Sequence, residues 1–199
     1  MEEFPYISFV PDKKTIMRRL GSQKATFPAG LDADIDAMIV KARSAFFVKG
    51  RAKVCSLLHV GEDIVEIDGL PVKSRLLSNM LKSSNGVYLM CATIPQRYVD
   101  RISAAMKQSE GLKAIVYDAY ASEYVDGALD VIMERKNVQL IRTGQKLTKL
   151  RFSAGYGDLD IRWQKPFYDM LGMSSLGVTI NEQFLLSPEK SVIAVAGVE

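Results

Sequence analysis

One short stretch of the sequence combines residue types that could bind a small charged ligand. Arg151 is followed by the turn residues Gly155, Tyr156, Gly157 and Asp158. A guanidinium is a planar fork suited to a carboxylate, and glycines let the backbone adopt positive φ close to a ligand. The pattern fits a ligand with a carboxylate and an aromatic base. From the pattern alone, however, a glycine-rich turn with an incidental tyrosine and a surface arginine is the simpler interpretation.

A second candidate is Asp126, which falls within a helix predicted over about residues 112–136. It stands four residues after Ser122 and three before Leu129, at the edge of the apolar stripe of that helix. A carboxylate at this position is either solvated or directed into a cleft. Without further information the solvated position is favoured.

The composition argues against several classes of function. The chain has 199 residues, of which 48% are hydrophobic and 25% are charged, as in a soluble globular protein. Its net charge of +3 comes without a long Lys/Arg run, so the basic stripe of a nucleic-acid binder is missing. No window reaches the roughly 20 apolar residues of a membrane span, and the N-terminus lacks the apolar run of a secretory signal. We therefore expect a cytoplasmic protein that binds neither nucleic acid nor membrane.

Familiar catalytic sets are also missing. The single histidine, His59, cannot form a His-based metal site alone, and its apolar neighbours place it on a strand. Cys55 and Cys91 lie in apolar stretches outside any C-x-x-C pair, which predicts two buried thiols in a reducing compartment. Neither a P-loop nor a strand followed by G-x-G-x-x-G is present. These observations argue against most Ser-His and Cys-His hydrolases and against the common nucleotide-binding folds.

Helices and strands alternate irregularly along the chain. Helices are predicted over residues 11–20, 32–49, 72–82, 96–108, 112–136 and 161–171, a loop over 22–30, and strands over 52–60, 63–67, 87–94, 138–152, 178–180 and 192–198. The run VYLMCATI at 87–94 is apolar throughout, as in a strand covered on both faces. We expect an α/β (α+β) protein with a mixed or antiparallel sheet. Residues 1–199 are predicted to form a single domain, with a helical arm over 1–50 and a core over 51–199.

The C-terminal part of the chain carries a family resemblance. It contains RFSAGYGD from Arg151, then Gln164 and Lys165, then LGVTINEQFLLSPEKSVIAVAG. This combination resembles the S-adenosylmethionine-binding activation domain of cobalamin-dependent methionine synthase, especially its stand-alone versions. The match is close over about residues 147–197 and weaker upstream, through 92–94 and the helix that contains Asp126. The proline that the family carries after its Gly-Tyr turn is absent.

The resemblance implies a set of site residues. Arg151 would hold the methionine carboxylate of S-adenosylmethionine, the backbone around Ala154 and Gly155 would accept the adenosyl part, and Tyr156 would line the site. Asp126 aligns with a family glutamate that contacts the ligand, which favours the cleft position for this carboxylate. The loop at residues 185–190 matches the segment that faces the corrin ring, and its implied contacts are Leu186, Ser187, Pro188 and Lys190. Further acidic and aromatic contacts of the family have no match here.

The resemblance also implies a fold, a function and partners. The family fold is a C-shaped α/β unit built on a twisted, mainly antiparallel sheet flanked by helices. In the family, S-adenosylmethionine is presented to inactive cob(II)alamin on methionine synthase while flavodoxin or another donor supplies an electron, and this reductive methylation restores methylcobalamin. We therefore expect an activation component for a separate methionine synthase, with no catalytic residue or metal of its own, rather than a complete enzyme. The alternatives are a reactivator of another corrinoid methyltransferase and a ligand-binding or interaction module without a redox role.

Overall fold

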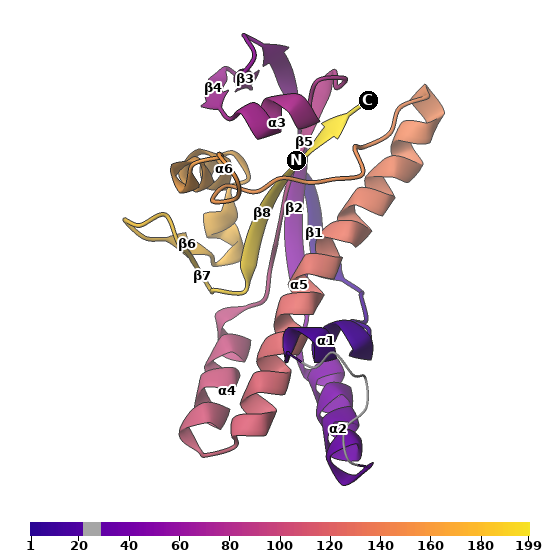
Figure 1. Ribbon diagram of the computed structural model, residues 1–199, viewed down its shortest axis with the longest axis vertical. Helices are drawn as coiled ribbons and strands as arrows, with labels where there is room; N and C mark the ends of the chain where they lie inside the picture. Colours follow the sequence, from indigo (N-terminus) through magenta and orange to yellow (C-terminus); the bar gives the residue numbers. More distant parts are fainter. Residues whose placement is uncertain (22–28) are drawn as a thin grey trace.

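The computed structural model describes residues 1–21 and 29–199, so most of the predicted loop at 22–30 lies outside the described residues. An antiparallel sheet has the strand order β4-β3-β2-β5-β8, and β1 also pairs with β2 (Figure 1). Its strands are β1 (Glu2–Ile7), β2 (Val48–His59), β3 (Ile64–Ile67), β4 (Leu70–Lys73), β5 (Gly86–Thr93) and β8 (Ser191–Val198). A separate hairpin consists of β6 (Thr179–Ile180) and β7 (Leu186–Ser187). The predicted α+β class, with a mainly antiparallel sheet flanked by helices, is confirmed.

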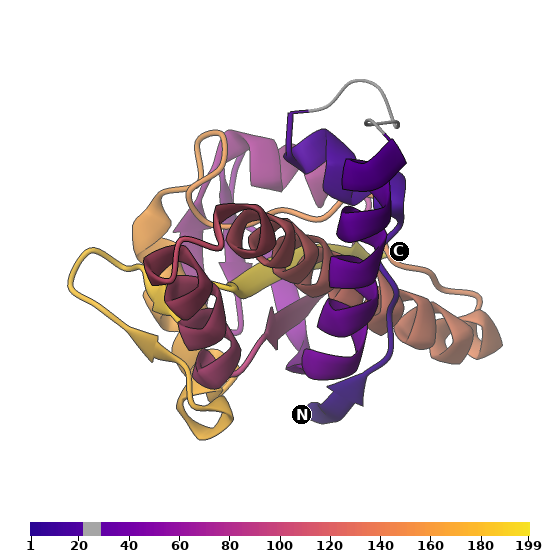
Figure 2. The same cartoon turned by 90° about the horizontal axis from the view of Figure 1, so that it is seen from below.

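The helices cover both faces of this sheet. They are α1 (Lys13–Arg19), α2 (Ala29–Ala45), α3 (Arg75–Met80), α4 (Gln96–Lys107), α5 (Gly111–Leu140) and α6 (Gln164–Met170), with short 3-10 turns η1 (Ile141–Thr143), η2 (Ile161–Trp163) and η3 (Met173–Leu176). The long helix α5 crosses the sheet, and α2 and α4 pack beside its N-terminal half (Figures 1 and 2). No helix in residues 1–21 and 29–199 is both long enough and apolar enough to span a membrane.

Strand β5 separates two cores, and its successive side chains join them alternately because they point to opposite faces of the sheet. Tyr88 and Met90 join the cluster under α5, whereas Leu89 and Cys91 join the cluster under α3 and α6. Every residue of β5 is buried, which confirms the predicted strand covered on both faces. Burial raises the pKa of Cys91 to about 12, so this thiol stays protonated at neutral pH.

The predicted helix over 32–49 is wrong at its C-terminal end. Helix α2 ends at Ala45, and Val48 already begins β2. Gly50, which resembles a helix-ending glycine in the sequence, is instead paired with Ala92 in the ladder between β2 and β5. The strand begins early because Val48 is fully buried and the first residues of β2 pair with β1 as well as with β5.

Two further predictions need correction. Residues 138–152 were expected to form strands, but α5 continues to Leu140, and a left-handed Gly144 with φ of 71° follows η1. The chain then runs extended and pairs with β8 through isolated bridges at Leu147 and Phe152 rather than through a continuous ladder. The predicted helix over 72–82 begins later, after the side chain of Ser74 accepts a hydrogen bond from the Leu77 N–H at 3.0 Å, because β4 occupies the preceding residues.

Candidate ligand-binding site

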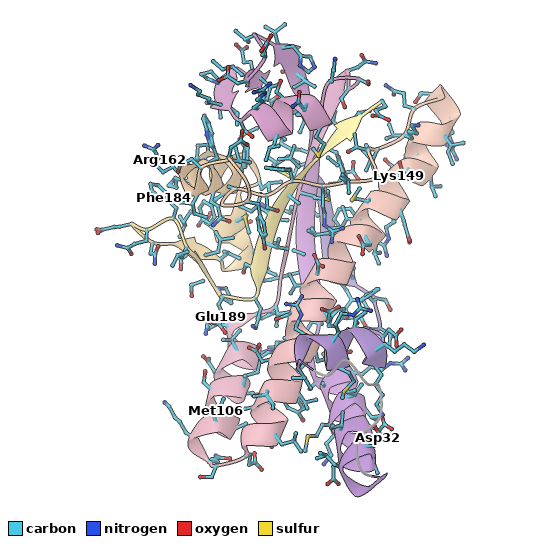
Figure 3. All side chains as sticks on the ribbon, viewed as in Figure 1. Asp32, Met106, Lys149, Arg162, Phe184 and Glu189 are labelled. Atoms are coloured by element: carbon cyan, nitrogen blue, oxygen red, sulfur yellow. The ribbon has the colours of Figure 1, made fainter. Side chains whose placement is uncertain are left out.

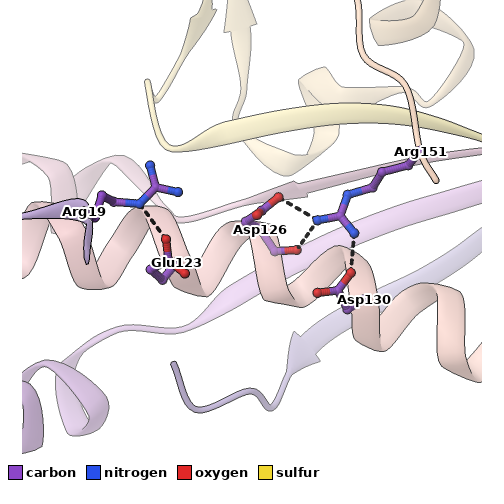
Figure 4. Close-up of polar contacts among 5 residues, drawn as sticks. All are labelled: Arg19, Glu123, Asp126, Asp130 and Arg151. Atoms are coloured by element: carbon purple, nitrogen blue, oxygen red, sulfur yellow. Dashed lines mark hydrogen bonds and ion pairs between the residues drawn. The ribbon is translucent and has the colours of Figure 1, made fainter. Parts of the chain in front are cut away.

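Arg151 lies against helix α5 and bridges two of its carboxylates (Figure 4). Asp126 and Asp130 are four residues apart, so they face the same side of the helix. The Arg151 Nη2 donates to Asp126 Oδ1 at 2.7 Å and to the Asp126 carbonyl at 3.2 Å, and Nη1 donates to Asp130. Burial lowers the pKa of Arg151, but the hydrogen bonds to both aspartates outweigh it, so the pKa lies above its usual value. A fixed cation therefore stands beside α5.

The backbone next to Arg151 explains this placement. Phe152 exchanges two hydrogen bonds of 2.8 Å with Val195 of β8. Arg151, the residue before Phe152, is thereby held between the sheet and α5. The position of the guanidinium thus depends on an isolated bridge that strand patterns in the sequence do not reveal.

The turn after Arg151 adopts the backbone that its glycines permit. Gly155 has a φ of 89° and Gly157 a φ of 56°, both in the left-handed region. The Gly155 N–H donates to Leu159 O at 2.8 Å, and the Leu159 N–H donates to Tyr156 O at 3.0 Å. Ala154 and Leu159 are buried and anchor the turn, whereas Tyr156 is 71% exposed. The turn therefore presents the tyrosine ring outward on a fixed base.

Asp158 ties this turn to helix α3. Its carboxylate accepts hydrogen bonds from Ser74 Oγ at 2.5 Å, from the Arg75 N–H at 2.8 Å and from the Leu76 N–H at 3.3 Å. The hydrogen bond from Ser74, joined by those from the backbone, lowers the pKa of Asp158 below its usual value. Asp158 is thus a structural carboxylate that stabilises the turn.

Replacing Asp158 with asparagine should destabilise the protein at neutral pH and much less in acid. The lost charge at the start of α3 should cost about 1 kcal/mol, or about 2–4 °C in Tm. Since the folded-state pKa is depressed, this stabilisation is present above the usual pKa of about 3.9 and is lost as the pH falls through the folded value. Thermal unfolding at pH 7 and pH 3 measures it, with Asp169→Asn as a control. Equal Tm differences at both pH values would contradict this role.

A hollow of about 310 Å³ brings three of the predicted site residues together, namely Asp126, Tyr156 and Lys190. It lies between α5, the Gly-Tyr-Gly turn and the start of β8. The remaining lining residues are Arg19, Ser122, Val125, Glu189, Ser191 and Val192. Arg151 reaches this hollow through its ion pair with Asp126, and Ala154 and Gly155 shape the turn beneath Tyr156. Ligand pockets in proteins span about 300–1,000 Å³, so the volume suits a small molecule.

The two cations in the wall of the hollow are held by ion pairs to α5. The Arg19 Nε lies 2.6 Å from Glu123 (Figure 4), and the Lys190 Nζ lies 2.7 Å from Asp118. The side chain of Lys190 is only 14% exposed. Both cations are therefore positioned by the same helix that carries Asp126.

The other predicted contacts of the 185–190 loop, Leu186, Ser187 and Pro188, do not line this hollow. Leu186 and Ser187 form β7 and pair with β6, and Pro188 is buried. The Ser187 hydroxyl lies 3.4 Å from Oε1 of Gln96, the first residue of α4. The proposed corrin-facing role of Leu186, Ser187 and Pro188 stays a prediction, whereas Lys190 belongs to the same hollow as Asp126.

Several site residues were not predicted. Ser122 precedes Asp126 by one helical turn, and Glu189 stands between two predicted residues, so helical spacing and adjacency could have indicated both. Asp130 could likewise have been found by its spacing from Asp126. Arg19 comes from α1, more than 100 residues away in the sequence, and no local signal connects it with the site.

A larger hollow of about 680 Å³ lies between β4, α3 and α6. Arg162 in its wall pairs with Asp160 at 2.7 Å, and Lys73 pairs with Asp63 at 3.5 Å. Its third carboxylate, Asp158, already accepts hydrogen bonds from Ser74, Arg75 and Leu76 at the start of α3. None of the predicted ligand contacts lines this hollow, so we place the candidate site in the smaller one.

The fold is an α+β domain with a hollow of small-molecule size beside its longest helix. Among solved structures, the chain is similar to one described as "Crystal Structure of the MetH Reactivation Domain bound to AdoHcy". The similarity has a TM-score of 0.69 at 15% identity and covers 94% of this chain and 74% of that chain. This agreement shows that the two share a fold, as the sequence resemblance predicted. No protein-family model and no curated protein sequence matches the chain.

Within residues 1–21 and 29–199, no group of three or more His, Cys, Asp or Glu side chains is arranged to hold a metal ion.

Proposed function

We propose that this protein binds S-adenosylmethionine in the hollow between α5 and the Gly-Tyr-Gly turn and supports the reductive methylation of cob(II)alamin on a separate cobalamin-dependent methionine synthase. The observation that carries the proposal is the meeting of Asp126, Tyr156 and Lys190 in one hollow beside Arg151. The fold shared with a reactivation domain that binds AdoHcy supports the same conclusion.

The side chains fit the parts of this ligand. The guanidinium of Arg151 offers five N–H groups and makes three hydrogen bonds to α5, so it retains donors for the methionine carboxylate. The exposed ring of Tyr156 offers a face for the adenine. The carboxylate of Asp126 lies at the same hollow and suits the ligand's ammonium or sulfonium group.

The chemistry needs positioning rather than a general base. A flavodoxin-like or other one-electron donor reduces the partner's cob(II)alamin, and the reduced cobalt then takes the methyl group. The carbon–sulfur bond breaks with its electron pair left on sulfur, which converts the sulfonium into a neutral thioether. Since the sulfonium is already a good leaving group, the contribution of this chain is to bind and orient the methyl donor.

Two alternatives make different predictions. A reactivator of another corrinoid methyltransferase would use the same site but would act on a different partner. A ligand-binding module without a redox role would bind S-adenosylmethionine and leave the corrinoid unchanged.

A spectral assay tests the proposal. Cob(II)alamin-loaded methionine synthase without its own activation domain should convert to methylcobalamin only when this protein, S-adenosylmethionine and a reductant are all present. Each omission should leave the cob(II)alamin absorption bands in place. A parallel assay with another corrinoid methyltransferase identifies the first alternative, and unchanged bands on both partners together with saturable ligand binding would identify the second.

A further inference from the structure

Carboxylates outnumber cations around the hollow. The ion pairs that reach its wall join four carboxylates, Asp118, Glu123, Asp126 and Glu189, with three cations, Arg19, Arg151 and Lys190. This network therefore carries one negative charge in excess. Such an excess favours ligands with a net positive charge.

Glu189 is the least neutralised member of the network. Its carboxylate lies 3.9 Å from the Lys190 Nζ, whereas Asp118 holds the same ammonium at 2.7 Å. Glu189 lies on the connection between β7 and β8 (Figure 3). Its side chain is 67% exposed and lines the hollow. By contrast, Glu123 and Asp126 have cations at 2.6 and 2.7 Å. The charge of Glu189 is thus the one most available to a ligand.

The methyl donor and its product differ by one charge. S-adenosylmethionine has a sulfonium, an ammonium and a carboxylate, hence a net charge of +1, whereas S-adenosylhomocysteine has a neutral thioether and a net charge of zero. We propose that Glu189 is a specificity-determining residue that makes the site prefer the sulfonium over the thioether. This inference rests on the proposed function and adds to it a means of releasing the spent product.

The expected size of the preference follows from Coulomb's law. For a carboxylate several ångströms from the sulfonium, with effective dielectric constants between those of water and a protein surface, removal of one charge changes the affinity by about 3- to 10-fold. The affinity for the uncharged thioether should hardly change. The contribution should also shrink at high salt because Glu189 is exposed to solvent.

Calorimetric titrations of S-adenosylmethionine and of S-adenosylhomocysteine test the inference. In Glu189→Gln the Kd for S-adenosylmethionine should rise about 3- to 10-fold, while the Kd for S-adenosylhomocysteine stays within a factor of two. Glu182→Gln, an exposed glutamate of the neighbouring hairpin that does not line the hollow, should leave both values unchanged. Circular dichroism and Tm confirm that each variant is folded.

Two results would overturn the inference while leaving the proposed function intact. One is an unchanged Kd for both ligands in Glu189→Gln, and the other is an equal loss of affinity for both ligands. If neither ligand binds the unaltered protein, the proposed function itself fails, and the titrations of the unaltered chain show this before any variant is compared.

Discussion

Replacing Arg151 with alanine should weaken the binding of S-adenosylmethionine by about 10- to 100-fold. A hydrogen bond to a charged group contributes about 1.5–3 kcal/mol, and each 1.4 kcal/mol is a factor of ten in Kd. The substitution also leaves Asp126 and Asp130 without the cation that they share. The two carboxylates would then face the methionine carboxylate directly, and their repulsion adds to the lost hydrogen bonds.

The same substitution should cost little stability. The Arg151 side chain is 22% exposed but both aspartates are 56% exposed, so solvent screens the two ion pairs, and we expect them to contribute about 1 kcal/mol together. We expect Tm to fall by no more than about 4 °C, so a loss of binding can be separated from unfolding. Calorimetry measures the Kd, and thermal unfolding measures Tm on the same sample.

Arg162→Ala provides the matched control. Arg162 is 72% exposed and pairs with Asp160 at 2.7 Å, but it lies outside the candidate hollow. Its removal should leave the affinity unchanged, and Arg151→Lys, which keeps the charge without the planar fork, should give an intermediate Kd. If Arg151→Ala bound S-adenosylmethionine as tightly as the unaltered protein, the assignment of this residue to the ligand carboxylate would be wrong.

Local patterns predicted much of the fold. The apolar run of β5 identified a strand covered on both faces, and helical spacing identified α4 and most of α5. These elements were predictable because their burial repeats within a few residues. The site was harder to predict from the sequence, since residues 126, 156 and 190 belong to three separate elements that meet only in the folded chain. The family resemblance, rather than spacing, assigned Asp126 and Tyr156 to one ligand site and Lys190 to the corrin-facing loop.

The features that the sequence did not predict depend on contacts between residues far apart in the chain. Arg19 enters the wall of the hollow because α1 packs on α5, and Asp130 matters only because an extended segment places Arg151 over it. Residues 138–152 read as strand from their composition, yet they extend α5 and then form single bridges to β8. In each case a contact across the fold, rather than local preference, decides the structure.

Gly50 shows the same principle and leads to the largest expected loss of stability. In the sequence it resembles the end of a helix, but it lies in β2, opposite Ala92 of β5. A Cβ at this position would stand 2.4 Å from the Cys91 carbonyl oxygen, 3.1 Å from Ile132 Cδ1 and 3.2 Å from Ile7 Cδ1. The nearest of these atoms belongs to the backbone, so no rotamer change can relieve the contact. The glycine therefore permits the close approach of β2 and β5 beneath α5.

Gly50→Ala should destabilise the protein by about 3 kcal/mol, which corresponds to a fall of roughly 6–12 °C in Tm for a domain of this size. Gly86→Ala tests whether the close contact, rather than the loss of a strand glycine, is the cause. Gly86 lies in β5 of the same ladder, opposite Ser56, but its Cβ would meet the nearest atom, the Cys55 carbonyl oxygen, at an ordinary 3.4 Å. Because alanine loses less backbone entropy than glycine on folding, Gly86→Ala should be neutral or slightly stabilising. Equal Tm values for the two variants would show that β2 and β5 can separate at Gly50 without cost, and that the packing of α5 over this pair does not depend on the glycine.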